Sequence, residues 1–67
     1  MSLYELNGIR PELVDAETVF LAPGSMVIGN VTLGKDVNFW SHAVARGDNE
    51  PIIIGDGSNI QEHSMLH

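Results

Sequence analysis

Apolar residues recur at every sixth position from residue 21 onward. The first five of them are Leu21, Val27, Leu33, Phe39 and Ala45. After a jump of nine positions, the spacing of six resumes with Ile54, Ile60 and Leu66. Because nine is six plus three, the pattern predicts an insertion of three residues between Ala45 and Ile54. The intervening segment 46–51, Arg-Gly-Asp-Asn-Glu-Pro, has the charged and turn-forming composition of a protruding loop.

A second set of small or β-branched residues stands four positions after these apolar anchors. Its members are Ser25, Val31, Val37, Ala43, Ser58 and Ser64. Two inward positions in every six residues predict a coil of short strands, separated by tight turns around a narrow interior. We therefore expect the anchors from Val27 to Leu66 to be buried in one core, with Val31, Val37 and Ala43 beside them. The alternative is the edge of an ordinary β-sandwich in which the spacing arises by chance.

Residues 1–20 do not follow the repeat. Turn signals stand at Asn7-Gly8 and Arg10-Pro11, and the apolar residues Tyr4, Leu6 and Ile9 suggest a short strand or hairpin. We therefore divide the chain into an N-terminal lead-in or cap, residues 1–20, and a repeat region, residues 21–67, with a loop insertion at about 46–51.

Composition and charge exclude several classes of protein. The 67-residue chain has no cysteine, so neither a disulfide nor a thiolate metal site is available. Nine acidic residues against three basic ones give a net charge of −6, which argues against a nucleic acid as partner. The longest apolar run, 19–22, is far too short to span a membrane, and no signal peptide is evident. The expectation is a cytoplasmic protein without a membrane partner.

The six-residue pattern resembles the hexapeptide repeat of left-handed parallel β-helices, in which three hexapeptides form one triangular coil. The left hand is implied by this resemblance alone, because connections between parallel strands are usually right-handed. A sharper resemblance, to the γ-class carbonic anhydrase family, is carried by three motifs in this order: Ala45-Arg46-Gly47-Asp48, the segment 53–62 with Asn59 and Gln61, and Met65-Leu66-His67. The resemblance extends over residues 21–67 and implies an all-β, left-handed parallel β-helix of under three coils after the short lead-in.

The resemblance also implies a set of functional residues. His67 matches the first zinc-ligand histidine of the family, and Arg46 and Asp48 match its active-site and subunit-contact cluster. Gln61 matches a glutamine that hydrogen-bonds near the metal-bound solvent, and Asn59 an asparagine beside it. Asn49 stands where the archetypal enzyme has a glutamate. The implied activity is hydration of carbon dioxide to bicarbonate by a homotrimer that holds zinc, or another divalent metal such as iron or cobalt.

The chain is shorter than members of that family. Their second and third metal ligands lie C-terminal to the part that this sequence matches, so we interpret the chain as the N-terminal portion of a longer protein. We do not expect the 67-residue segment alone to be active. Two alternatives remain open: a hexapeptide acyltransferase with a coenzyme A groove, and a non-catalytic metal-binding scaffold or accessory subunit of the same fold.

Individual polar residues allow simpler interpretations beside these roles. Arg46 and Asp48 stand two positions apart, so they can pair either as a solvated loop ion pair or at a subunit contact. Asn59 can cap a turn instead of serving a site. His63 and His67 have the i, i+4 spacing of a helical metal pair, but side chains on a strand alternate between its two faces, so this spacing does not converge on a metal. We expect His63, and likewise His42, to be a solvated surface residue.

The register of the repeat makes a geometric prediction. Arg46 and His67 each follow an anchor, Ala45 and Leu66, that falls on the same side of successive coils. They should therefore lie in neighbouring rungs. Trp40 and Gln61 are related by the same offset on the preceding side, and Trp40 should point outward, at a subunit contact or against a packed cap.

Overall fold

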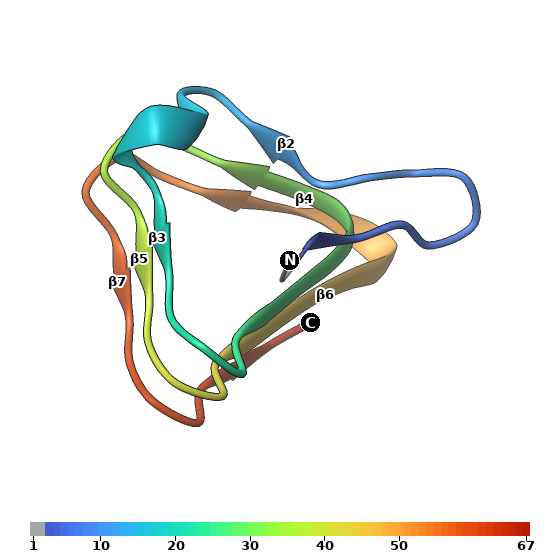
Figure 1. Cartoon of the computed structure of the whole chain (residues 1–67). Helices are drawn as coiled ribbons and strands as arrows, with labels where there is room; N and C mark the ends of the chain where they lie inside the picture. Colours follow the sequence, from blue (N-terminus) through green and yellow to red (C-terminus); the bar gives the residue numbers. More distant parts are fainter. Residues whose placement is uncertain (1–2) are drawn as a thin grey trace.

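The computed structural model describes residues 3–67 and shows a three-sided coil of parallel strands (Figure 1). The elements in chain order are β1 (Leu3–Tyr4), β2 (Glu12–Leu13), the 3-10 turn η1 (Ala16–Thr18), β3 (Phe20–Leu21), β4 (Met26–Leu33), β5 (Asn38–Phe39), β6 (Val44–Ile54), β7 (Asn59–Ile60) and β8 (Met65–Leu66). The fold is a parallel β-solenoid with no α-helix among the described residues, as the hexad spacing predicts. Within residues 3–67, no helix is long and apolar enough to cross a membrane.

The strands pair in two parallel sheets that lie on different sides of the coil. One sheet joins β1, β4, β6 and β8 in that order, with β2 also paired to β4, and the other joins β3, β5 and β7. In Figure 1 the second sheet forms the left side of the triangle, whereas β4 and β6 bend around the corner opposite it. The predicted lead-in strand is β1. It is followed by a tight turn that Leu6 and Ile9 close with two backbone hydrogen bonds of 2.9 and 3.0 Å.

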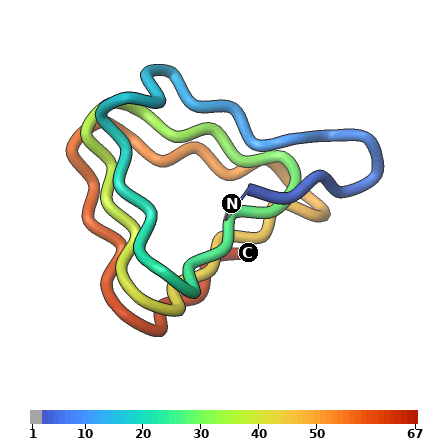
Figure 2. The backbone as a smooth tube through the Cα atoms, in the orientation of Figure 1, coloured from blue at the N-terminus to red at the C-terminus, as the bar shows by residue number. Residues whose placement is uncertain are grey.

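That turn projects beyond the triangle, as the blue segment of Figure 2 shows. Asn7 and Gly8 both adopt positive φ, 53° and 79°, which is the backbone that an Asn-Gly pair favours in a two-residue hairpin turn. The turn signal in the sequence therefore has a direct structural counterpart.

The strand register locates the insertion. Val27 pairs with Ala45, 18 positions later, whereas Leu33 pairs with Ile54, 21 positions later. The change falls between the pairs Gly29–Gly47 and Val31–Ile52, where three additional residues are accommodated. The predicted insertion is thus confirmed. Arg46 and Gly47 still belong to the strand ladder, so the loop begins after Gly47.

The core contains the predicted residues of the central coil. Val27, Leu33, Val37, Phe39, Ala43 and Ala45 are fully buried, Val31 is 1% exposed and Ile54 is 6% exposed. Ile60 and Leu66, which we also expected to be buried, are only half-buried and pack against the edge of this core. The reason is that they belong to the last coil, and no further coil of residues 3–67 covers their open side.

Candidate functional site

Arg46 and His67 lie in neighbouring rungs of one side of the coil. β6 and β8 are paired with Val44 opposite Met65 and Ala45 opposite Leu66. His67 directly follows this pairing and Arg46 directly follows Ala45, so the two residues continue the same ladder. Rungs of a parallel sheet are about 4.8 Å apart. The predicted register is confirmed, and it brings a guanidinium and an exposed imidazole to one surface.

The ladder that contains Arg46 continues through the two preceding rungs. Ile28 is paired with Arg46 in β6, and Tyr4 is paired with Ile28. Both residues therefore stack above Arg46 on the outer surface of this side. Arg46 thus lies between an apolar neighbour above it and the His67 rung below it.

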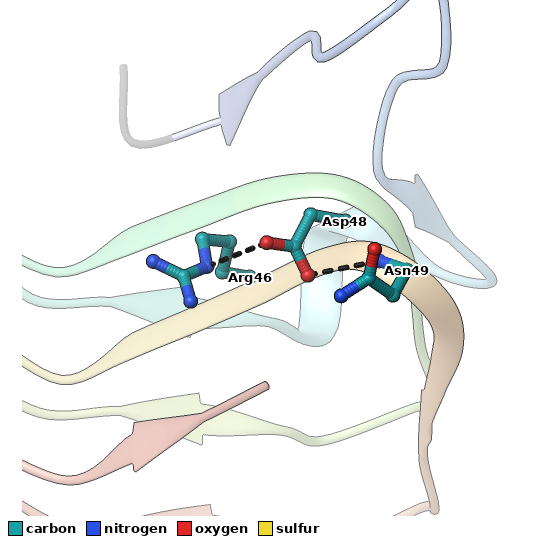
Figure 3. Close-up of polar contacts among 3 residues, drawn as sticks. All are labelled: Arg46, Asp48 and Asn49. Atoms are coloured by element: carbon teal, nitrogen blue, oxygen red, sulfur yellow. Dashed lines mark hydrogen bonds and ion pairs between the residues drawn. The ribbon is translucent and has the colours of Figure 1, made fainter.

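Arg46 forms an ion pair with Asp48 at the start of the insertion. Its Nε lies 3.1 Å from Asp48 Oδ2, and the two side chains are 43% and 34% exposed (Figure 3). Nε is itself buried and the contact is not aligned as a hydrogen bond, so the attraction is chiefly electrostatic. Figure 3 shows the terminal nitrogens of the guanidinium turned away from Asp48, free to meet another group.

Asp48 is held in place by the loop itself. Its Oδ1 accepts a hydrogen bond of 2.8 Å from the backbone N–H of Asn49. The carboxylate therefore meets both Arg46 and the first turn of the insertion. Asn49, at the position where the family archetype has an acid, contributes this backbone N–H and no negative charge.

The glycine between Arg46 and Asp48 is required by close backbone packing. A Cβ on Gly47 would overlap the backbone carbonyl of Asn30 in the coil above, and a Cβ on Gly29 would come within 2.7 Å of the Gly47 carbonyl oxygen. The two strands can therefore turn this corner together only with glycine at both positions. This close approach determines the position of the corner, with Arg46 in the last paired part of the strand and Asp48 as the first residue of the loop.

Gln61 and Asn59 lie on another side of the coil. Asn59 is paired with Asn38 in the β5–β7 ladder, and Gln61 follows Ile60, whose carbonyl accepts a 2.9 Å hydrogen bond from the N–H of Trp40. The predicted neighbourhood of Trp40 and Gln61 is therefore present. A single chain, however, does not bring Gln61 and Asn59 together with Arg46 and His67, because a corner of the triangle separates the two sheets.

The turn before Asn59 is stabilised by other residues. Ser58 Oγ donates a 2.8 Å hydrogen bond to the carbonyl of Gly55, and Gly57 adopts a φ of 76°. Among the described residues, the side chain of Asn59 takes no part in this turn. The turn-capping alternative for Asn59 therefore has no support in the structure.

Trp40 points outward and packs against Phe20 in a tilted arrangement. Their ring centroids are 5.1 Å apart at an interplanar angle of 56°, and the two residues remain 36% and 46% exposed. An exposed aromatic pair beside Gln61 has the composition of an interface core.

Sequence reasoning missed two features of the corners. Asp56 Oδ1 accepts a 2.8 Å hydrogen bond from the backbone N–H of Lys35, which ties one coil to the next. His42 and His63, expected to be separate solvated residues, are exposed but stack on one another with ring centroids 5.4 Å apart. The spacing of 21 between the two histidines, equal to that of Arg46 and His67, is the signal that could have found this pair.

His67 is suited to be one ligand of a metal centre. Neutral imidazole is a preferred donor for zinc, and the side chain is exposed at the end of the ladder. Within residues 3–67, no group of three histidine or acidic side chains gathers around a common point. His67 therefore fits a zinc site as one ligand, and the remaining ligands would have to come from outside residues 3–67.

Comparison with known proteins identifies the family. No family model matches the chain. It is 46% identical over 58 residues, or 87% of its length, to a protein named gamma carbonic anhydrase 2, mitochondrial, from Arabidopsis thaliana. It is 35% identical over 65 residues, or 97% of its length, to a carbonic anhydrase of Geobacillus kaustophilus. The chain belongs to the γ-carbonic anhydrase-like family.

A third relative has a name that states no enzymatic activity. Protein YrdA of Escherichia coli is 45% identical over 51 residues, which is 76% of this chain. The γ-carbonic anhydrase-like chain spans 20% of the Arabidopsis protein, 35% of the Geobacillus protein and 28% of YrdA. The matched region is thus a minor part of each of these relatives.

Proposed function

We propose that this chain supplies one edge of a metal-dependent site at which the intact protein hydrates carbon dioxide to bicarbonate. The observation that carries the proposal is the adjacency of Arg46 and His67, which the pairing of Ala45 with Leu66 produces. The family relationship supplies the reaction class.

In this proposal His67 holds a divalent metal through its imidazole, together with two ligands from outside residues 1–67. Zinc, when bound, acts as a Lewis acid that lowers the pKa of a coordinated water to about 7. Iron or cobalt would be held by the same donor type.

Arg46 binds and orients the anionic product. The guanidinium offers several N–H donors in a planar fork that fits a carboxylate-like anion. Because Asp48 engages only Nε, the terminal nitrogens can turn toward the neighbouring rung that carries His67. Asp48 thus orients Arg46, and Gly47 allows the backbone to present both residues at the same corner.

Gln61 acts at the site of a neighbouring copy. Its amide can both donate and accept hydrogen bonds, so it could orient a water molecule at the site of that copy. It lies on the β7 side, away from His67 of its own chain, so a threefold assembly would join the β7 side of one copy to the β8 side of the next. Asn59 would approach the same contact, and the exposed Trp40–Phe20 pair supplies apolar surface for it. We propose a homotrimer on these grounds.

The test uses the full-length protein loaded with zinc. Metal content, sedimentation and stopped-flow hydration of carbon dioxide are measured for the wild type, for His67→Asn and for the control Glu62→Gln, a change at an exposed residue. We expect a trimer whose hydration rate falls by at least about 100-fold in His67→Asn, since a lost ligand removes the metal at that site, while Glu62→Gln retains both metal and rate. A wild type that binds zinc stoichiometrically but hydrates carbon dioxide no faster than buffer would contradict the proposal.

That contrary result would favour the scaffold alternative. One feature of the chain supports this second candidate: Asn49 replaces an acid in the loop beside Asp48, so the insertion carries one fewer group able to transfer protons. A monomer by sedimentation would count separately against the threefold arrangement and against the assignment of Gln61.

A further inference from the structure

His42 and His63 occupy the same corner of successive coils, away from the His67 rung. Both adopt the left-handed backbone conformation, each with a φ of 62°, and Gly24 has a φ of 83° at the corresponding corner of the coil above. A Cβ on Gly24 would lie 3.0 Å from His42 Nε2 and 3.1 Å from its Cδ2. The imidazole of His42 therefore rests on the bare backbone of Gly24, and the ring of His63 follows on its other side.

The two rings are nearly parallel. Their centroids are 5.4 Å apart and their planes differ by 7°. Each backbone is held by short turns: the N–H of Ala43 donates to the carbonyl of Trp40 at 3.1 Å, and the N–H of Ser64 donates to the carbonyl of Gln61 at 3.2 Å. A third bond of 3.2 Å, from the N–H of His63 to the carbonyl of Ser41, ties the two corners together. The fold thus holds the backbones that carry the two side chains at neighbouring rungs.

The turn itself does not account for histidine at both positions. Glycine and asparagine are the residues that adopt this left-handed backbone conformation most readily. Within residues 3–67, no hydrogen bond or ion pair engages either imidazole, and both residues are exposed. Two imidazoles are therefore stacked one rung apart, and neither has a polar partner among the described residues.

We propose that His42 and His63 together chelate one late first-row divalent metal ion, at a site separate from that of His67. A metal about 2.0–2.1 Å from each donor nitrogen needs the two nitrogens within about 4 Å of each other. Rings stacked on adjacent rungs reach this separation when their nitrogen-bearing edges tilt together, and the exposure of both side chains leaves that rotation open. Imidazole donors favour Cu²⁺ over Ni²⁺ and Zn²⁺, and water fills the remaining coordination positions.

The net charge of −6 favours a cation at this corner, since the three basic residues, Arg10, Lys35 and Arg46, belong to other parts of the coil. The site is also distinct in sequence: β8 lies between His63 and His67. Binding at the histidine pair therefore does not need the ligand that the proposed carbonic anhydrase site uses.

The probe is the Cu²⁺–iminodiacetate complex, because the chelator occupies part of the coordination sphere and leaves room for two imidazoles. The chain is titrated by calorimetry and by electron paramagnetic resonance as wild type, His42→Asn, His63→Asn and His67→Asn. Asparagine tolerates the left-handed backbone, so the first two variants remove the donor and keep the turn. Circular dichroism verifies that each variant is folded.

We expect one complex per chain in the wild type, with hyperfine splitting from two imidazole nitrogens. Either corner variant should weaken binding by about 100-fold or more, because the second donor no longer acts intramolecularly. His67→Asn should leave affinity and spectrum unchanged. Equal affinities of wild type, His42→Asn and His63→Asn would overturn the proposal, as would a loss of binding in His67→Asn alone. Neither result bears on carbon dioxide hydration, which is measured separately with zinc.

Discussion

The central coil and the last coil follow the same six-residue rule but differ in burial. Leu33 and Phe39 in the central coil are fully buried, whereas Ile60 and Leu66 in the last coil are half-buried. A hollow between the end of β6 and β8 is lined by Ile52, Ile53, Ile54, Met65, Leu66 and His67. The hexad position therefore decides which way a side chain points, and a neighbouring coil decides how much of it is buried.

The largest predicted effect tests this difference with one substitution in two coils. Leu33→Ala should lower the free energy of unfolding by about 2–5 kcal/mol, because it leaves a cavity in a fully enclosed site. Leu66→Ala should cost less than about 2 kcal/mol, since its side chain is already partly in water and the open side can relax. Urea denaturation of the chain measures both values.

An equal loss in the two variants would contradict the idea that stacking produces burial. The comparison becomes sharper in a longer protein that carries a further coil. There Leu66→Ala should approach the cost of Leu33→Ala, because both leucines would then be covered on both sides.

Much of this architecture follows from the sequence alone. The interval of nine between Ala45 and Ile54 predicts the change of register, and the register in turn places Arg46 beside the His67 rung. These features depend on backbone periodicity, which a sequence records directly. The half-burial of Ile60 and Leu66 could not be predicted from the hexad pattern, because it depends on what lies beyond the last coil.

The corners were less predictable than the strands. Periodicity does not specify where a corner side chain turns, so the stacking of His42 on His63 and the bond from Lys35 to Asp56 emerged only in the structure. The functional roles of Gln61 and Asn59 depend on how copies meet, and a single chain does not determine that. These roles stay predictions.

A second, smaller effect contrasts two corners of the coil. Gly47→Ala should cost about 1–3 kcal/mol, because its Cβ would overlap the Asn30 carbonyl and force the strands apart. Gly55→Ala is the matched control: a Cβ there meets nothing within 4 Å, so the change should stay within about 0.5 kcal/mol. Thermal denaturation of the two variants measures the difference. If both variants were neutral, close packing at the insertion corner would not be the reason for glycine at position 47.

The smallest effect concerns the ion pair at that corner. Asp48→Asn removes the charge facing Arg46 but keeps an oxygen that can accept the bond from the Asn49 N–H. Both side chains are partly exposed, so the loss should be below about 1 kcal/mol at low ionic strength. It should become negligible in about 1 M salt, where the screening length falls to about 3 Å. Urea denaturation at the two salt concentrations measures the change. A loss well above this limit that persists in high salt would mean that Asp48 supports the fold, whereas a small, salt-sensitive loss leaves its main task as orienting Arg46 toward the His67 rung.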